Sequence, residues 1–468
     1  MLQNFHYDFI YFLGIGGIGM SALARLLHAQ HYKVFGYDRT DSSLIMQLRK
    51  EGIPVSCEDS TENIPKIICK NNTKTLVIYT PAIPSNSPIL NYFKVGGYKI
   101  QSRAEILGEI SKLFSSIAVA GTHGKTTTTA MVAHILHSSQ WPMLAFVGGI
   151  VDLYETNLIH NCPLDQVKLI VAEADEFNRS FLHLSPTHSV ITSVDPDHPE
   201  TYHNLQLMQE SFVQFIQQIK QTLVIQHDAA IKLQISHACN IPYLTYGLSK
   251  GDISARNLYL ETHQSTFDYI GYDEKISNIT LPIPGLYNIE NALAAITICL
   301  KVGISPTQIQ SSIASFPGIK RRFAYLFKSK KYILIDDYAH HPVEVAALLT
   351  SIKKIYPNRL ITAIFQPHLF SRTQRFYKEF AASLSIADEV FLLPIYPARE
   401  APIPHVTSKL ILDKLTCNKK ALVTIHELLS NSELFFTNNQ CIIVSIGAGD
   451  IGEAVLSIVE ILKKMVVV

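Results

Sequence analysis

The chain has 468 residues, 47% of them hydrophobic, and its 40 lysines and arginines balance its 39 aspartates and glutamates. This length predicts about three domains of roughly 150 residues, and the hydrophobic content excludes a disordered chain. The balanced charge argues against nucleic acid or an acidic membrane as the main partner.

The cysteines and the apolar runs indicate the compartment. The seven cysteines are scattered and form no C-x-x-C pair, which argues against disulfides or a zinc site and favours a reducing compartment. No apolar run reaches the roughly 18 to 20 residues that a spanning helix needs. We therefore expect a cytoplasmic protein without a membrane partner.

Apolar runs typical of buried strands alternate with segments of helical period along most of the chain. Such pairs lie at 9–13 and 18–30, at 117–120 and 125–137, and at 441–446 and 450–463. The alternation predicts α/β units with parallel sheets. Breaks at 109–116 and 315–323 place domain boundaries near 110 and 320.

The first strand leads into a glycine-rich loop, GIGGIG, that opens a helix. Glycines at Gly14, Gly16, Gly17 and Gly19 allow a tight turn and a close approach to a diphosphate at the positive end of the helix. The next strand ends at Asp38, which is placed to meet a ribose hydroxyl. The pattern favours phosphate binding, with a tight packing turn as the alternative.

A second loop, in VAGTHGKTTTTA, also joins a strand to a helix. It departs from the usual phosphate-loop spacing, because Val119 stands where a glycine is expected. Gly121 and Gly124 still fit a compact nest of backbone N–H groups. Lys125 supplies a charge for the terminal phosphate and Thr126 a hydroxyl for magnesium. The alternative is an ordinary glycine turn with a solvated lysine.

Acidic residues follow two further apolar runs. LIVAEADE ends in Glu173, Asp175 and Glu176, and SVITSVDPDHPETY contains Asp195, Asp197 and His198. Parallel strands deliver such ends to one sheet edge, where a metal and nucleotide site can form. Magnesium prefers oxygen ligands, so the residue chemistry alone favours the carboxylates. A structural histidine is then at least as good an explanation for His198.

A third glycine loop, GAGDIG at 447–452, has the same shape as the first. No acidic strand end follows it. It is therefore interpreted as a close-packing turn.

Taken together, AGTHGKTTTTAM, EADE, DHPETY, GLYNIENALAA, RRF, DDYAHHPVEV and FQPHLFSRT resemble the Mur ligases of bacterial cell-wall synthesis. The resemblance runs from Gly14 to Gly452, and this family has the same short phosphate-loop spacing. It implies an α/β fold of three domains: Rossmann-like at both ends, with a central P-loop ATPase whose sheet is mostly parallel. The implied domains are 1–110 for a UDP-sugar, 111–320 for ATP and 321–468 for an amino acid.

The resemblance also implies a reaction. ATP and Mg²⁺ activate the carboxylate of UDP-N-acetylmuramate as an acyl phosphate, which the amine of L-alanine attacks. A tripeptide in place of alanine, as in murein recycling, is the nearest alternative. A monomer or weak homodimer is expected. The rival classes are an NAD-dependent oxidoreductase and a nucleotide-regulated binding module without catalysis.

Site residues follow from the resemblance position by position. Lys125, Glu173 and His198 are implied as catalytic, with Thr126, Glu173 and His198 on the metal. The implied ATP-binding residues are Gly121, Thr122, His123, Gly124, Lys125, Thr126, Thr127, Asn288, Asn291, Arg322 and Asp337. The implied UDP-sugar residues are Gly14, Gly16, Gly17, Gly19 and Asp38. The implied amino-acid pocket consists of Tyr338, His340, His368 and Arg372.

This chain departs from the family pattern in several places, and two of them bear on the predicted site. Phe177 and Asn178 stand where Ser-Asp usually follows EADE, and Leu369 stands where a basic residue usually follows the histidine. The second departure leaves Arg372 as the expected partner of the alanine carboxylate, with Arg399 as the alternative cation.

Overall fold

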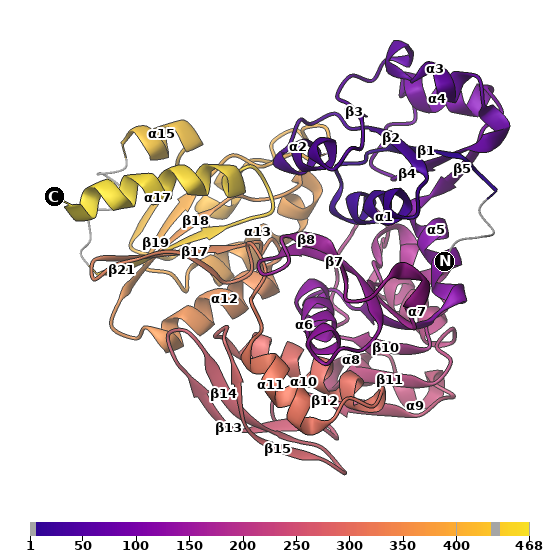
Figure 1. Cartoon of the computed structure of the whole chain (residues 1–468). Coiled ribbons are helices and arrows are strands. Elements are labelled where there is room, and N and C mark those ends of the chain that lie inside the picture. The colour runs from indigo at the N-terminus through magenta and orange to yellow at the C-terminus, as the bar shows by residue number, and fades with distance from the viewer. Residues whose placement is uncertain (1–5, 399, 432–439, 468) are drawn as a thin grey trace. The chain divides into compact units, whose positions relative to one another are not determined.

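The computed structural model describes residues 6–398, 400–431 and 440–467 (Figure 1). Contacts divide these described residues into two compact units. The first unit contains the residues up to Pro196, with Thr201–Ser254 and Asn291–Ile313. The second unit contains Asp197–Glu200, Ala255–Glu290 and the described residues from Ala314 onward. Each is described below by itself.

The N-terminal sheet of the first unit has parallel strands in the order β3-β2-β1-β4-β5. Its strands are β1 (Phe9–Leu13), β2 (Lys33–Tyr37), β3 (Val55–Ser56), β4 (Thr75–Tyr79) and β5 (Lys99–Ser102). Its helices are α1 (Ile18–Ala29), α2 (Ser43–Lys50), α3 (Lys66–Cys69), α4 (Pro88–Val95) and α5 (Arg103–Leu113), with 3₁₀ turns η1 (Thr61–Asn63) and η2 (Asn72–Lys74). Alternate residues of β1 enter opposite cores, Phe12 in the core that includes α1 and Tyr11 against Phe93 of α4.

The central sheet has the order β12-β11-β10-β6-β9-β7-β8, parallel except for the antiparallel β7–β8 pair. Its strands are β6 (Ser115–Ala120), β7 (Met143–Val151), β8 (Thr156–His160), β9 (Leu169–Glu173), β10 (His188–Ile191), β11 (Thr222–Gln226) and β12 (Tyr243–Tyr246). The helices are α6 (Lys125–Ser138), α7 (Leu205–Ile216), α8 (His227–Lys232) and α9 (Ile235–Ala238), with turns η3 (Leu164–Gln166) and η4 (Phe177–His183). Because β6 pairs with both β9 and β10 in parallel, the loops after these three strands meet at one edge.

A buried polar network joins α1 to the β7–β8 hairpin. Arg25 donates from Nε and Nη2 to Glu51, at 2.7 and 3.0 Å, and from Nη1 to Asn157 Oδ1 at 2.5 Å. The fully buried Asn157 of β8 donates in turn to Ser21 Oγ at 3.0 Å and to the Ile18 carbonyl. A buried guanidinium and amide are tolerated here because their polar atoms are paired.

After the central sheet, the chain forms a small sheet of order β13-β14-β15, in which β14 and β15 are antiparallel. Its strands are β13 (Ser254–Leu260), β14 (Ser265–Ile270) and β15 (Lys275–Leu281), followed by α10 (Leu286–Lys301) and α11 (Pro306–Ala314). The boundary between the two units falls inside α10, after Glu290.

The C-terminal sheet has the order β16-β17-β21-β18-β19-β20, parallel except for the antiparallel β16–β17 pair. Its strands are β16 (Ala324–Lys328), β17 (Tyr332–Asp337), β18 (Leu360–Phe365), β19 (Glu389–Leu392), β20 (Lys419–Leu422) and β21 (Cys441–Ile446). The helices are α12 (Pro342–Ile355), α13 (Phe370–Leu384), α14 (Lys409–Leu412), α15 (Ile425–Ser430) and α17 (Ile451–Val467). Helices α12 and α17 cover opposite faces of this sheet (Figure 1). Ile333 of β17 belongs to the core that contains residues of α12 and α13, and Leu334 belongs to the core that contains residues of α15 and α17.

These sheets confirm the predicted α/β class with mostly parallel sheets. The glycine loop after β21 is confirmed as a close-packing turn, because a Cβ at Gly452 would collide with the Arg321 guanidinium and one at Gly449 would lie 2.7 Å from Tyr396. None of the helices in the described ranges is long and apolar enough to cross a membrane.

Candidate active site

The first glycine loop is held by an acidic residue from the next strand. Asp38 accepts from the Gly16 amide at 2.8 Å and from the Thr40 amide at 3.1 Å. Asp38 therefore holds the backbone of the glycine loop in place just before α1. The Arg103 guanidinium packs so closely on Gly19 that an added Cβ would collide with it.

A cavity of about 220 Å³ lies beside this loop within the first unit. Its lining includes the start of α1, Thr80 and Arg103 on one side and the ends of β7 and β9, with Gly148, Glu173 and Asp175, on the other. The Arg103 guanidinium lies 3.7 Å from the Asp175 carboxylate. The glycine loop and the acidic strand end thus share one cavity of mixed charge.

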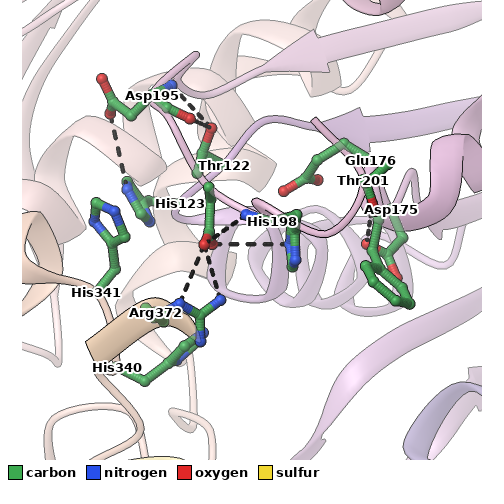
Figure 2. Close-up of polar contacts among 12 residues, drawn as sticks. Thr122, His123, Asp175, Glu176, Asp195, His198, Thr201, His340, His341 and Arg372 are labelled. Atoms are coloured by element: carbon green, nitrogen blue, oxygen red, sulfur yellow. Dashed lines mark hydrogen bonds and ion pairs between the residues drawn. The ribbon is translucent and has the colours of Figure 1, made fainter. Parts of the chain in front are cut away.

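The second glycine loop runs from β6 into α6. Thr122 donates its amide to the Ser193 carbonyl at 3.1 Å, and its hydroxyl and the Asp195 backbone bond each other in both directions, at 2.9 and 3.1 Å (Figure 2). Gly124 caps α6 with a φ of +81°, and a Cβ there would collide with the Asn291 amide. Only glycine fits this left-handed and crowded position. The loop is therefore a rigid nest before the helix N-terminus.

Lys125, the first residue of α6, turns back into the loop. Its ammonium donates to the Gly121 carbonyl at 2.5 Å, to the Thr122 carbonyl at 3.2 Å and to Glu176 Oε1 and Oε2 at 3.0 and 2.8 Å. Burial by itself lowers the pKa of Lys125, but Glu176, Asp175 and Glu173 outweigh it and raise the pKa. The lysine is therefore held as a cation.

The acidic residues at the end of β9 gather near this lysine. Glu176 is fully buried, and Glu173 accepts from the Gly148 amide at 2.6 Å. Asp175 accepts from the Phe177 amide at 3.0 Å. Asn178 has a φ of +52°, a left-handed conformation that asparagine tolerates well, which gives this departure from the family pattern a local role. A cluster of anionic oxygens at one strand end suits a hard divalent cation such as Mg²⁺.

His198 belongs to the second unit. Its backbone has a φ of +52°, its amide donates to Asp197 Oδ1 at 2.8 Å, and its ring nitrogens lie 3.8 Å from Asp197 and from Glu200. A non-glycine residue with this φ is held by its surroundings, which is typical of functional positions.

The two asparagines of α10 are both buried. Asn288 donates to the Pro284 carbonyl at 2.7 Å, and Asn291 accepts from Thr128 of α6 at 3.4 Å. Their spacing of three places them on the same face of the helix. Asn291 packs directly on Gly124 of the second glycine loop.

In the second unit, Arg322 lies over the Tyr338 ring, 5.0 Å from its centroid. Asp337 accepts from the Phe323 and Ala339 amides at 2.7 and 2.8 Å. Burial raises the pKa of Asp337 to about 6, although Arg322 and these amides act in the opposite direction. The carboxyl group at the end of β17 thus titrates close to neutral pH.

The predicted amino-acid pocket residues come together around His368. The His340 ring lies 6.0 Å from the His368 ring and 5.4 Å from that of Tyr338. Arg372 Nη1 lies 3.4 Å from His368 Nδ1. Burial lowers the pKa of His340 to about 4, so this imidazole is neutral near pH 7. His341, in contrast, caps α12 through a capping box with Glu344.

Arg372 is almost fully buried and paired with an acid. Its Nε and Nη2 donate to Asp197 Oδ1 at 3.2 and 2.8 Å (Figure 2). Burial alone would raise the pKa of Asp197, but Arg372, with smaller contributions from His198, His341 and His340, holds it well below its usual range. Leu369 is the N-cap residue of α13, and it has a φ of +71° and a buried side chain.

Family models and relatives match nearly the whole chain. The models described as "Mur ligase family, catalytic domain", "Mur ligase middle domain" and "Mur ligase, glutamate ligase domain" match residues 9–115, 119–299 and 321–445. The UDP-N-acetylmuramate–L-alanine ligase of Cytophaga hutchinsonii is 41% identical over 447 residues, 95% of each chain. That of Flavobacterium johnsoniae is 43% identical over 456 residues, 97% of this chain and 98% of its own. The chain belongs to the Mur ligase family.

Solved structures agree with this family assignment. The UDP-N-acetylmuramate–alanine ligase of Thermotoga maritima has a TM-score of 0.81 at 29% identity and covers 98% of this chain and 99% of its own. A murein peptide ligase of Psychrobacter arcticus has a TM-score of 0.69 at 21% identity, covering 97% and 99%, and shows the fold alone. The three-domain Mur ligase fold implied by the motifs is confirmed, and Mur ligases are ATP-dependent ligases.

Sequence reasoning missed three contacts of this Mur ligase. The pairing of Lys125 with Glu176 and of Arg372 with Asp197 joins residues far apart in sequence, so no local pattern indicated either pair. Arg103 had a local signal: Ser102 and Glu105 form a capping box, which places Arg103 at the start of a helix that follows a strand.

Proposed function

We propose that this Mur ligase joins L-alanine to the carboxylate of UDP-N-acetylmuramate, with conversion of ATP to ADP and phosphate. The observation that carries the proposal is the identity of 41 to 43% with UDP-N-acetylmuramate–L-alanine ligases over nearly full length. It places this chain at the first amino-acid addition of peptidoglycan precursor synthesis. A cytoplasmic location follows from the ATP and UDP-linked substrates.

The chemistry explains the need for a phosphate. A carboxylate is a poor electrophile, so a sugar carboxylate oxygen first attacks the γ-phosphorus of ATP and ADP leaves. The alanine amine then attacks the carbonyl carbon of the acyl phosphate, loses a proton, and expels phosphate as the amide forms. Both steps develop negative charge, which fixed cations and backbone dipoles stabilise.

The phosphate loop and the acidic end of β9 are assigned to phosphoryl transfer. Lys125 would neutralise the terminal phosphate, and the loop amides with Thr122, His123 and Thr127 would hold the chain of phosphates. Thr126, Glu173 and His198 would hold Mg²⁺, which supplies Lewis-acid stabilisation of the phosphate oxygens when bound. The cluster of anionic oxygens near Lys125 supports this assignment.

The adenosine side is assigned to residues that flank the loop. Asn291 packs on Gly124, and Asn288 lies one turn before it in the same buried helix. Arg322 and Asp337, at the start of the C-terminal region, complete the proposed ATP-binding set. The buried, hydrogen-bonded positions of Asn288, Asn291 and Asp337 support a fixed role.

The N-terminal region, residues 1–110, is assigned to the UDP-sugar, with the loop from Gly14 to Gly19 facing the diphosphate. Asp38 would keep this loop in shape, because its carboxylate already bonds Gly16. Residues 111–320 are assigned to ATP. The shared cavity of the glycine loop, Arg103 and Glu173 supports delivery of the sugar carboxylate to the nucleotide.

Residues 321–468 are assigned to alanine. Its carboxylate would meet Arg372, in a pocket formed with Tyr338, His340 and His368. A methyl side chain offers little for recognition, so the planar guanidinium supplies most of the affinity. We propose a monomer or weak homodimer, as expected from the sequence.

One experiment tests the reaction. Phosphate release is measured with ATP, Mg²⁺ and UDP-N-acetylmuramate against a panel of amino acids and the tripeptide. Alanine is expected to give the highest kcat/KM. A preference for the tripeptide would identify a murein-recycling ligase instead, and turnover without any amino acid would contradict the ligase assignment.

A further inference from the structure

The Lys125 ammonium has no unused proton donor within the described part of the chain. An ammonium carries three N–H groups, and four oxygen atoms already surround it at 2.5 to 3.2 Å. Two of these belong to loop carbonyls and two to Glu176. A phosphate oxygen therefore cannot bind Lys125 without replacing one of them.

The loop carbonyls are poor candidates to leave. They belong to Gly121 and Thr122, whose loop is tied by the Thr122 amide to Ser193 and by the Thr122 hydroxyl to Asp195. Glu176, in contrast, reaches Lys125 with its side chain and not with its backbone. Its carboxylate is also negatively charged, like the ATP phosphate that has to bind Lys125.

Burial makes this pair specific. Glu176 is fully buried and its neighbours Glu173 and Asp175 are also acidic, so the ion pair with Lys125 compensates a charge that is held away from water. The backbone of Glu176 is anchored separately, because the Tyr202 hydroxyl donates to its carbonyl at 2.7 Å. The side chain can therefore change partner while the main chain stays in place.

The geometry points to Glu176 as a positioning residue that occupies the phosphate's place on Lys125 and is displaced when ATP binds. This inference rests on the proposed role of Lys125 and adds a competitor for it. Competition makes Lys125 available in only a fraction of molecules, and the apparent affinity for ATP falls by that fraction. Glu176 thus tunes nucleotide affinity without touching the substrates.

Calorimetry with metal-free ATP in EDTA tests the inference, since it isolates the lysine–phosphate contact from the metal. Glu176→Gln is expected to bind at least about threefold more tightly than the wild type, because Lys125 becomes available. Equal or weaker binding would overturn the inference and leave Glu176 as a support of the loop.

Asp175→Asn is the matched control. It removes the same charge one residue away, from a side chain whose ion pair is with Arg103 and not with Lys125. Its gain in affinity should be clearly smaller than that of Glu176→Gln. Equal gains would show that general repulsion is relieved and would overturn the displacement model.

Two further variants separate the inference from the proposed role of Lys125. Lys125→Ala should weaken ATP binding. In that background, adding Glu176→Gln should raise ATP affinity by no more than Asp175→Asn does in the wild type. If Lys125→Ala binds ATP normally, the assignment of Lys125 fails, and the inference fails with it. If Glu176→Gln does not fold, Glu176→Asp keeps the charge but shortens the side chain, and it should also tighten binding; unchanged binding in a folded Glu176→Asp would overturn the inference.

Discussion

The phosphate loop and the amino-acid pocket each hold a buried cation beside a buried acid, at 2.8 Å in both cases. Lys125 uses all its donors on the loop and Glu176. Arg372 has five N–H groups, of which its Nε, Nη2 and Nη1 contacts within the described residues use three. A phosphate on Lys125 therefore has to exchange with Glu176, whereas Arg372 keeps two N–H groups for the proposed alanine carboxylate beside Asp197.

The largest expected effect is at the phosphate loop. Lys125→Ala should lower kcat for ligation by about a thousandfold or more, because the charge that faces the transferred phosphoryl group is removed. Binding of UDP-N-acetylmuramate should be unchanged in calorimetry, since its glycine loop is separate. An equal loss of sugar binding would contradict separate phosphate and sugar sites.

Asp197 and Asp337, two buried acids of the second unit, are expected to affect the pH dependence of stability differently. Asp197 is held ionised by Arg372, whereas burial raises the pKa of Asp337 to about 6. Because the folded pKa of Asp337 is raised, its contribution to stability is present below about pH 4 and is lost as the pH rises through 6. The free energy of unfolding of Asp337→Asn, relative to wild type, should thus rise by about 2 kcal/mol from pH 4 to 7.

Denaturant titrations at several pH values measure this difference. The matched comparison is Asp336→Asn, whose acid is buried beside Arg321 and also has a raised pKa. A flat difference between Asp337→Asn and wild type would show that Asp337 stays ionised throughout.

Arg372→Ala should raise the KM for alanine at least about tenfold, with less effect on the KM for ATP. Arg372→Lys should recover only part of the loss, since a point charge cannot form the paired hydrogen bonds. Steady-state kinetics at saturating ATP and UDP-sugar measure both. An unchanged KM for alanine would assign its carboxylate to another cation; Arg399, the alternative from the sequence, lies outside the described residues.

The smallest predicted effect concerns the metal. Glu173→Gln should raise the Mg²⁺ concentration for half-maximal activity by up to about tenfold, because one anionic ligand becomes neutral. Initial rates over a Mg²⁺ series measure the shift. Unchanged dependence would show that Glu173 does not hold the metal.

The sequence was most informative where local chemistry determines local structure. The three glycine loops, their strands and their helices were predicted from short patterns, and so was the gathering of acids at one sheet edge. Asp38 was placed at the right strand end, but its carboxylate bonds the Gly16 amide in the structure. Its predicted contact with a ribose stays a prediction.

The ion pairs could not be predicted, for a physical reason. Glu176 lies 51 residues from Lys125, and Asp197 lies 175 residues from Arg372. Which acid compensates which buried cation depends on sheet order and on side-chain packing, and neither is encoded in a local spacing. Leu369 is a similar case, because its left-handed backbone follows from the turn between β18 and α13.

The Arg25–Asn157 network bears on modularity. The proposed functional division lies near residue 110, yet Arg25 of α1 donates to Asn157 of β8 across it, and Asn157 donates back to the Ile18 carbonyl. A fragment cut there would leave Arg25 with Glu51 as its remaining partner and would remove the Arg25, Ile18 and Ser21 partners of Asn157, which is fully buried in the whole chain. The proposed sugar-binding region therefore cannot be exchanged between ligases by itself. A chimaera with the ATPase region of another ligase also needs the β7–β8 hairpin of this chain.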